Sequence, residues 1–339
     1  MYKTSFKLTP ITPMVHFQKG NDLSIRGSEL KPLFDSFISQ SLIDEHIGKK
    51  YGHRMSELSL DVDGEKEGNH YDYQIRVESL SSTAIKMPDN HVFFLKGKQL
   101  YNLEIKVTFL SRHIKLMELI VELFPYFVSQ TFFGFRKGKG FGQFKIVGEQ
   151  SSTNLLENIK KSYKIIGKEI KVIEINRETI DPIQTLEQIR LLNREIKAMY
   201  LHEYSESEGI YTEKKVVEAG SKSAKTYYMR GMLGLATGMG KLVESKPEYS
   251  IKKTGRIRIP NPFKYYVSDD YQKIYLVIEL KQLEKIQTHF KDTAFRFNKT
   301  KGGTEIKLFL PPVEEVSSDF WNGFVDYLEQ KEHSNIEEG

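Results

Sequence analysis

The first 150 residues alternate between polar and apolar positions in four short stretches. A period of two residues places every second side chain on the same face, which is typical of a strand with one buried face. The prolines at Pro10 and Pro13 end regular pairing after the first stretch, because proline has no backbone N–H to donate. The four predicted strands are Tyr2–Leu8, Tyr71–Val77, Leu103–Phe109 and Phe141–Val147.

Two other stretches carry apolar residues at spacings of three and four, which predicts helices with one buried side. The first runs from about Ser28, whose hydroxyl group can cap the helix N-terminus, to Leu42. The second begins near Arg112 and ends at about Pro125. The resulting order, β-α-β-β-α-β, predicts an α+β fold with a ferredoxin-like module of the kind that RRM domains use. Such a module leaves one face of its sheet free of helices.

The chain is long enough for two domains. We assign residues 1–150 to the ferredoxin-like domain, residues 151–171 to a polar, lysine-rich linker and residues 172–328 to a second α+β domain. A second ferredoxin-like fold is one candidate for that domain. Its patterns predict strands at 168–175, 274–280 and 305–310, and helices at 182–204, 227–236 and 314–327. The polar residues 329–339 are expected to form a disordered tail.

A glycine-rich segment, FFGFRKGKGFGQFKIV (residues 132–147), lies between the second predicted helix and the last predicted strand. Its glycines and cations are Gly134, Arg136, Lys137, Gly138, Lys139, Gly140 and Gly142, and it contains no acidic residue. Glycine lets the backbone approach a ligand closely, exposed N–H groups can bind an anion, and Arg and Lys favour phosphate. The segment has neither the P-loop motif nor the dinucleotide-binding fingerprint. It predicts a polyphosphate partner, and a flexible hairpin with solubilising basic residues is the alternative.

Composition narrows the classes of function. The net charge of +5 and the pI near 8.9 permit a nucleic-acid partner. No cysteine is present, which excludes disulfides, thiolate zinc sites and cysteine nucleophiles. The nine histidines form no HExxH motif or similar ligand pair, so no metal and no cofactor is expected. The sequence has no signal peptide and no apolar run of about 18 residues, so we expect a cytoplasmic protein without a membrane partner.

Two motifs resemble those of the RAMP superfamily, the repeat-associated proteins of CRISPR-Cas effector complexes. FGFRKGKGFGQFKI is similar to the glycine-rich loop that these ferredoxin-like proteins carry between the last helix and the last strand of the module. The run TPITPMVHFQKGNDLSIRGSELK is similar to the type III pattern, in which Gly-Ser-x-Leu-Lys opens the first helix. The resemblance covers about residues 1–150. It implies a subunit of a type III-like effector ribonucleoprotein that binds guide RNA (crRNA), beside other effector subunits, in antiviral defence.

The resemblance also implies where the RNA would bind. Arg26, Ser28 and Lys31 lie at the predicted N-terminus of the first helix, where backbone N–H groups and the helix dipole favour phosphate. With the glycine-rich segment they form the predicted RNA-binding set. The family often has Lys-Gly and then Arg where this chain has Lys31-Pro32 and Asp35, so the phosphate contact of that later position is not carried over.

A second basic stretch, IKKTGRIRIPNPFKYY (residues 251–266), contains Arg256 and Arg258. It resembles the late arginine and proline segment of RAMP subunits that have tandem ferredoxin-like domains. We therefore add both arginines to the predicted RNA-binding residues. A charged edge strand that its lysines protect against aggregation is the alternative.

Two other functions remain open. A metal-independent endoribonuclease that processes CRISPR repeat RNA would need a general base near neutral pKa, and His16 or His46 could serve. Asp22 is the only acid between the first strand and the Gly-Ser motif, where type III backbone subunits carry the aspartate that cuts target RNA; a solvated loop aspartate is the alternative. A scaffold whose basic surface meets protein partners is the other function. We assign no catalytic residue.

Overall fold

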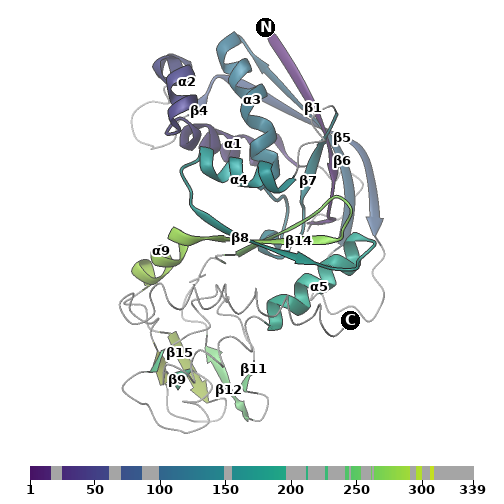
Figure 1. Cartoon of the computed structure of the whole chain (residues 1–339), viewed down its shortest axis with the longest axis vertical. Coiled ribbons are helices and arrows are strands. Elements are labelled where there is room, and N and C mark those ends of the chain that lie inside the picture. The colour runs from purple at the N-terminus through teal and green to yellow at the C-terminus, as the bar shows by residue number, and fades with distance from the viewer. Residues whose placement is uncertain are drawn as a thin grey trace. The chain divides into compact units, whose positions relative to one another are not determined.

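The computed structural model in Figure 1 describes residues 1–16, 25–60, 70–85, 99–148, 155–195, 211–212, 226–227, 241–243, 246–252, 261, 263–290, 295–299 and 306–308. The chain forms two compact units. The first consists of Met1–Ile170, Asn176–Glu187 and Tyr265–Tyr275, and the second of Lys171–Ile175, Gln188–Lys264 and Leu276–Gly339. Among the described residues, no helix is both long enough and apolar enough to cross a membrane.

The main sheet of the first unit has five strands, which are β1 (Tyr2–Pro10), β2 (Met14–His16), β5 (Tyr73–Ile85), β6 (Gln99–Ser111) and β7 (Phe144–Val147). Strand β6 pairs with β5 and with β1, and β1 pairs with β7 on its other side; all three pairs are antiparallel. The order β5-β6-β1-β7, with helices between β1 and β5 and a helix between β6 and β7, is that of the ferredoxin-like fold. The predicted α+β fold and its ferredoxin-like module are confirmed.

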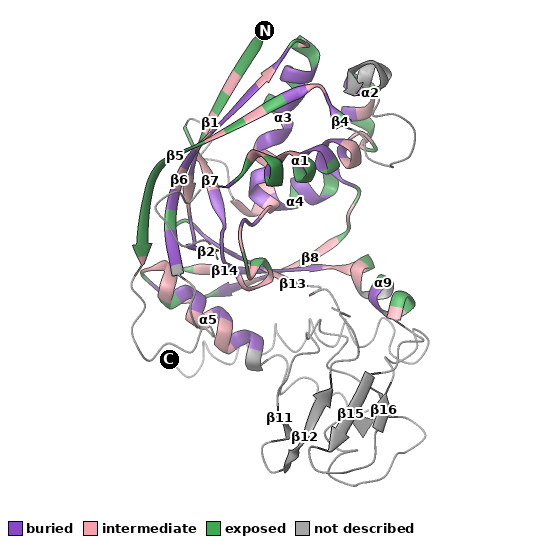
Figure 2. Cartoon of the chain, turned by 180° about the vertical axis from the view of Figure 1, so that it is seen from behind, coloured by how far each residue is buried: buried purple, intermediate pink, exposed green. Residues whose placement is uncertain are grey.

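Helices α1 (Gly27–Ser41) and α3 (Ile114–Gln130) cover one face of this sheet (Figure 1). Their contact with the sheet is dominated by aromatic rings, because Phe34, Phe109, Phe124 and Phe127 are buried with ring centroids 4.9–5.9 Å apart in each contacting pair. Burying a side chain of this size contributes roughly 1.5–3 kcal/mol. The opposite face of the sheet carries polar side chains, and most of the outer strand β5 is exposed (Figure 2).

Two helix ends differ from the prediction: the C-terminal end of α3, expected at about Pro125, and the N-terminal end of α1, where Ser28 was expected to cap the helix. Helix α3 contains Pro125 and continues to Gln130. Proline leaves the carbonyl of Val121 without a helical donor, but Val121 is 42% exposed, so water can reach that carbonyl, while Phe127 and Val128 beyond the proline are buried. At α1 the N-cap residue is Arg26 and not Ser28, and no side chain caps the helix.

Helix α4 (Leu155–Ile165) lies within the segment 151–171 that was predicted as a linker. The lysines of this segment obscured a helical pattern whose apolar positions, Ile159 and Tyr163, are both buried and four residues apart. Helix α4 packs against α3. Helix α2 (Glu45–Leu58) was not predicted either, and it leads to the short antiparallel pair β3 (Ser59–Leu60) and β4 (His70–Tyr71).

The second half of the chain is also α+β. The elements β8 (Ile170–Asn176), α5 (Pro182–Glu195), β13 (Phe263–Val267), β14 (Lys273–Glu279) and α9 (Leu280–Phe290) follow one another in this order, with further strands between α5 and β13. Their three-stranded sheet has the order β13-β14-β8, which matches the order β5-β6-β1 in the first sheet. The chain thus repeats, after residue 170, the beginning of a ferredoxin-like strand order.

A separate four-stranded sheet has the order β11-β12-β15-β16, and β9 pairs with β10 in parallel. The strands are β9 (Tyr211–Thr212), β10 (Thr226–Tyr227), β11 (Lys241–Val243), β12 (Lys246–Lys252), β15 (Phe295–Lys299) and β16 (Ile306–Leu308). The predicted strands at 168–175, 274–280 and 305–310 correspond to β8, β14 and β16. The predicted helix at 227–236 begins in β10 and otherwise lies outside the described residues, as do the helix at 314–327 and the tail.

Candidate nucleic-acid interface

The glycine loop, which we define as Phe132–Gln143, is joined by hydrogen bonds to β2 and to the residues between β1 and β2. The Phe133 N–H donates to the Gly142 carbonyl at 2.8 Å, and the Phe135 N–H donates to the Val15 carbonyl at 3.1 Å. Two isolated bridges, Phe132 with Gln143 and Val15 with Phe135, follow from this pairing. The base of the loop is therefore a short hydrogen-bonded hairpin held against the N-terminal strands.

Three of the loop glycines adopt left-handed backbone conformations, with φ of +79° at Gly134, +80° at Gly140 and +75° at Gly142. A Cβ atom at Gly142 would lie 1.9 Å from the Phe133 carbonyl oxygen, and one at Gly134 would lie 2.7 Å from the Val15 carbonyl oxygen. These two positions thus require glycine, because the loop backbone there packs directly against the backbone of Phe133 and of Val15. Gly138 differs, since it lies within the single 3-10 turn η1 (Lys137–Lys139).

The cations of the loop lie within that turn or directly before it. Arg136 precedes it in the left-handed conformation, with φ of +60°, and Gly140 ends it. Partial burial lowers the pKa of the Arg136 guanidinium, because removal of water disfavours the charged form. Lys137 is exposed and Lys139 is half-buried. A bound anion would restore the favourable surroundings that Arg136 loses by burial.

Two buried residues, Thr12 and Gln143, hold the C-terminal half of the loop in place through hydrogen bonds. The Thr12 hydroxyl donates to the Gly140 carbonyl at 2.6 Å and accepts from the Gln143 N–H at 3.0 Å. The Gln143 side chain bonds Val267 twice, through its Oε1 to the N–H at 2.8 Å and through its Nε2 to the carbonyl at 3.0 Å. Thr12 and Gln143 are buried, so these bonds are shielded from water.

The N-terminus of α1, the second predicted RNA contact, is open to solvent. Arg26 and Ser28 are exposed, and the helix has an acidic residue, Glu29, in its first turn. Gly27 lies so close to β5 that a Cβ atom there would be 3.1 Å from the Ile75 carbonyl oxygen. The glycine of the Gly-Ser motif thus allows α1 to pack closely against β5, whereas the serine of the motif is exposed.

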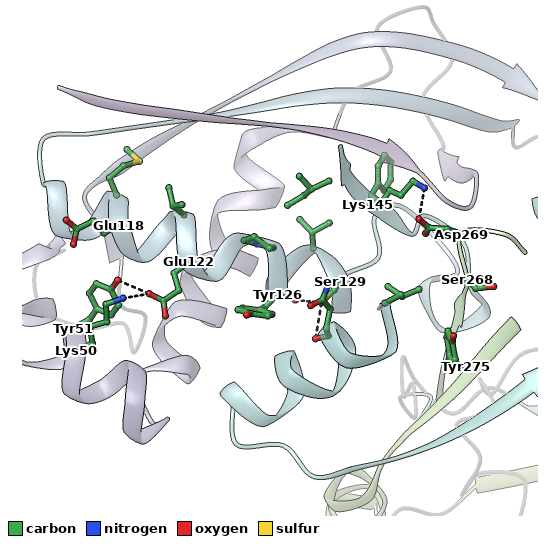
Figure 3. Close-up of a pocket in the computed structure, with 18 of the residues that line it drawn as sticks. Lys50, Tyr51, Glu118, Glu122, Tyr126, Ser129, Lys145, Ser268, Asp269 and Tyr275 are labelled. Carbon is green, nitrogen blue, oxygen red and sulfur yellow. Dashed lines mark hydrogen bonds and ion pairs between the residues drawn. The ribbon is translucent and has the colours of Figure 1, made fainter. Parts of the chain in front are cut away.

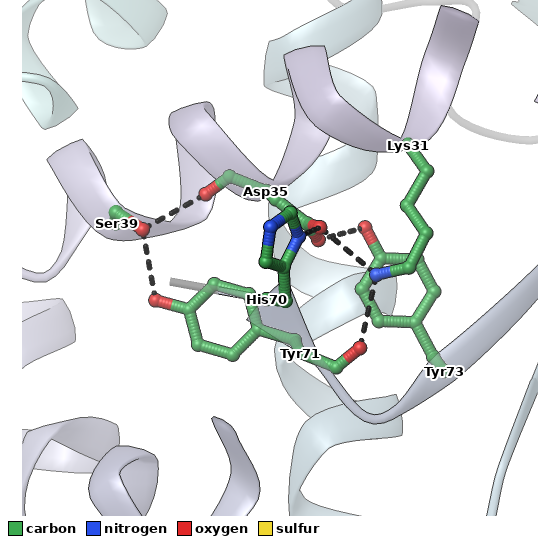
Figure 4. Close-up of polar contacts among 6 residues, drawn as sticks. All are labelled: Lys31, Asp35, Ser39, His70, Tyr71 and Tyr73. Atoms are coloured by element: carbon green, nitrogen blue, oxygen red, sulfur yellow. Dashed lines mark hydrogen bonds and ion pairs between the residues drawn. The ribbon is translucent and has the colours of Figure 1, made fainter. Parts of the chain in front are cut away.

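The Lys31 side chain is directed toward Asp35, Tyr71 and Tyr73 (Figure 4). Its ammonium group lies 2.9 Å from the Asp35 carboxylate, 2.9 Å from the Tyr71 carbonyl and 4.0 Å from the centre of the Tyr73 ring. The Tyr73 hydroxyl donates to the other Asp35 oxygen at 2.6 Å. Burial, helped by the nearby Asp35 carboxylate, raises the pKa of Tyr73, so this phenol keeps its proton and remains a donor.

The face of the sheet opposite the helices is moderately basic. Its register places Lys7 beside Lys106 and Lys106 beside Glu78, and its cations are Lys3, Lys7, Arg76, Lys106 and Lys145. Two of them are engaged in ion pairs: Lys7 with Glu104 at 3.1 Å and Lys145 with Asp269 at 2.6 Å.

Two other candidates, His16 and His46, lie on elements that the structure describes. His46 is exposed on α2, and of His16 only the backbone, in β2, is described. Asp22, Arg256 and Arg258 lie outside the described residues. Within the described ranges, no group of three or more histidine or acidic side chains could hold a metal ion.

A groove of about 1100 Å³ runs along α3 and was not predicted from the sequence (Figure 3). Its lining includes Tyr2, Ile114, Val121 and Ile146, as well as Glu122, which accepts from Lys50 Nζ at 2.6 Å and from the Tyr51 hydroxyl at 2.9 Å. Ile114 and Val121 belong to the apolar pattern that predicted this helix, yet both are exposed. Apolar periodicity alone does not distinguish a residue in the core from one that lines a groove.

A protein family and a solved structure match this chain. No curated protein sequence matches the chain. The apo crystal structure of Cmr1 from Pyrococcus furiosus is similar, at 14% sequence identity over 96% of this chain and 97% of that one, with a TM-score of 0.44. The family described as the Cmr1 N-terminal domain matches residues 1–200, which is more than half of the sequence. The chain therefore belongs to the Cmr1 N-terminal domain family, and with it to the RAMP proteins that are subunits of type III CRISPR effector complexes.

Proposed function

We propose that this subunit binds the backbone of a guide RNA at the glycine loop. The observation that carries the proposal is the exposure of Phe135. Of the five phenylalanines between residues 132 and 144, Phe135 is 47% exposed, and the other four are at most 3% exposed. An exposed ring beside cations is the combination that proteins use to stack a base while they hold the adjacent phosphates.

The fixed backbone of the loop supports the same proposal. Hydrogen bonds at Phe133, Phe135 and Gly140 hold the two sides of the loop, so the cations at its tip are held close together before a ligand arrives. A preorganised site loses less conformational entropy on binding. The charge of Arg136 is also partly desolvated, which strengthens its attraction to a phosphate.

The remaining predicted contacts form part of the same proposal. We include Arg26 and Ser28, which are exposed at the N-terminus of α1, while Arg256 and Arg258 stay predictions from the sequence. Lys31 is the weakest member of the set, because Asp35 already binds its ammonium group. We propose that Lys31 supports the helix N-terminus through this ion pair, and that Arg26 and Ser28 contact the RNA.

The test measures the affinity of the full chain for a fluorescently labelled crRNA at several salt concentrations. The triple variant Arg136→Ala, Lys137→Ala, Lys139→Ala is expected to lose most of the affinity, and the log–log salt slope should become shallower by about 2, at about 0.7 per phosphate contact. Phe135→Leu should weaken binding by about 1–3 kcal/mol if one base stacks on the ring.

A matched control removes three exposed lysines on helices α2 and α4, namely Lys49, Lys160 and Lys164. This control changes the net charge equally but should leave the salt slope nearly unchanged. Equal losses in the two triple variants would refute a specific role for the loop. Cleavage of a repeat RNA in EDTA, lost in His16→Ala or His46→Ala, would instead favour the endoribonuclease.

A further inference from the structure

Among the described residues, strand β1 has an edge without a partner strand near its N-terminus. Strand β6 pairs with β1 from Tyr2 to Leu8, whereas β7 pairs only with Lys7 to Pro10. In the part of the chain that the structure describes, Tyr2–Phe6 therefore has a neighbouring strand on one side only, and Figure 1 shows β1 extending past β7 toward the N-terminus. An edge of this kind is a template for another strand.

The hydrogen-bond pattern identifies which backbone groups face the open side. The Ile11 N–H donates to the Gln143 carbonyl at 2.8 Å, so this pair belongs to the hydrogen-bonded class. Backbone direction alternates along an antiparallel strand, so the odd-numbered residues of β1 point toward β7 and the even-numbered residues toward β6. Lys3 and Ser5 therefore direct two N–H and two carbonyl groups toward the open side, where no strand within the described residues pairs with them.

The groove along α3 lies beside this edge. Tyr2, Ile114 and Val121 all line it, and they are 43%, 48% and 42% exposed. Exposure on the helix-facing side of β1 rises from Leu8, which is fully buried, through the partly buried Phe6 to Tyr2. The apolar surface thus becomes uncovered where β7 ends.

We propose that an extended segment of a neighbouring protein subunit adds to β1 at Tyr2–Phe6 as a further strand. Its backbone would pair with Lys3 and Ser5, and every second side chain would be apolar and cover Tyr2, Ile114 and Val121. The alternate side chains would lie on the other face beside Lys3, where an acidic residue gives a favourable cross-strand pair. The proposal does not depend on RNA binding at the glycine loop.

Charge disfavours a second copy of the chain as the occupant, and strand geometry favours β1 over the opposite edge of the sheet. A second copy of the chain would bring its own Lys3 and Lys7 to the same face as Lys3 and Lys7, and like charges on neighbouring strands repel. The opposite edge of the sheet, β5, has a register shift between Ser79 and Ser81, and such irregularities disfavour the addition of a strand. No irregularity interrupts the pairing of β1 with β6.

The test compares residue-resolved hydrogen exchange in the isolated full chain and in the complex obtained by co-expression with the effector subunits encoded beside it. The Lys3 and Ser5 amides should exchange at least a hundredfold more slowly in the complex. The Thr4 and Phe6 amides, which point toward β6, should be protected in both states and serve as an internal control.

A pair of variants separates the groove from general surface effects. Val121 on α3 and Leu33 on α1 are both 42% exposed, so Val121→Gln and Leu33→Gln make the same kind of change at equal exposure. Val121→Gln should weaken assembly at least tenfold, and Leu33→Gln should leave it unchanged. Unchanged exchange of Lys3 and Ser5 in the complex would overturn the proposal. So would their protection by RNA alone, or by self-association of the isolated chain.

Discussion

The side-chain amide of Gln143 bonds both backbone groups of Val267, at 2.8 Å to its N–H and 3.0 Å to its carbonyl. In this arrangement the glutamine replaces the neighbouring strand that would otherwise satisfy Val267. Gln143 also closes the glycine loop through Phe132 and Thr12. One buried side chain therefore joins the loop to the strand β13.

We expect Gln143→Ala to destabilise the protein by about 2–6 kcal/mol, because it leaves two buried backbone groups unpaired at about 1–3 kcal/mol each. Urea denaturation measures this loss. Gln74→Ala, at an exposed glutamine in β5, is the control and should change stability by less than about 0.5 kcal/mol. Equal stability of the two variants would show that the Gln143 bonds contribute nothing.

Gly142→Ala should prevent folding or cost more than about 3 kcal/mol, since φ is +75° and the added Cβ would lie 1.9 Å from the Phe133 oxygen. Gly52→Ala is the matched control. Gly52 is an exposed helical residue with open space around it, so alanine should stabilise the chain by about 0.5–1 kcal/mol. Soluble yield and urea midpoints report both effects, and a folded Gly142→Ala variant of normal stability would contradict the loop geometry.

Lys31→Met should destabilise the fold by about 3 kcal/mol, because it leaves the buried Asp35 carboxylate without its main cation. Adding Asp35→Asn removes the orphaned charge and keeps an acceptor for Tyr73, so the double variant should recover much of this loss. A double-mutant cycle in urea measures the coupling. Strictly additive effects would mean that the ion pair does not stabilise α1.

The contribution of Glu122 to stability should depend on pH. Burial alone would raise the pKa of Glu122, but the hydrogen bonds from Lys50 and Tyr51 outweigh burial and lower it below 4.5. A lowered folded-state pKa means that the stabilisation is complete above the unfolded value and is lost as pH falls through the folded value. The difference in Tm between wild type and Glu122→Gln should thus be largest near pH 6 and shrink below about pH 4.5. If the Tm difference between wild type and Glu122→Gln did not change with pH, the lowered pKa of Glu122 would be contradicted.

The ferredoxin-like module was predictable because its strands alternate regularly and its two main helices have continuous apolar faces. The ends of these helices were less predictable, since α3 continues past Pro125 into residues that are buried against the rest of the protein. Helix α4 was missed because its lysines dominate the local composition, and β13 because Phe263–Val267 reads as part of a basic stretch.

The sequence identified the glycine loop as a unit but not the roles of its members. Gly134 and Gly142 proved to be backbone-packing positions, which depends on contacts with Val15 and Phe133 that no local pattern reveals. The difference between the exposed Phe135 and its four buried neighbours also arises only in the folded chain. Likewise, the fixed orientation of Lys31 depends on Tyr71 and Tyr73, which are distant from it in the sequence.

The bonds that hold the glycine loop also constrain when it can form during synthesis. Thr12 and Gln143 are 131 residues apart, and Gln143 and Val267 are separated by another 124. Closing such long loops is slow compared with local helix formation. A nascent chain that ends before Val267 lacks the last of these partners, so the loop acquires its complete set of bonds only when most of the protein has been translated. The folded loop is therefore a late product of the whole chain and not a local motif that forms early.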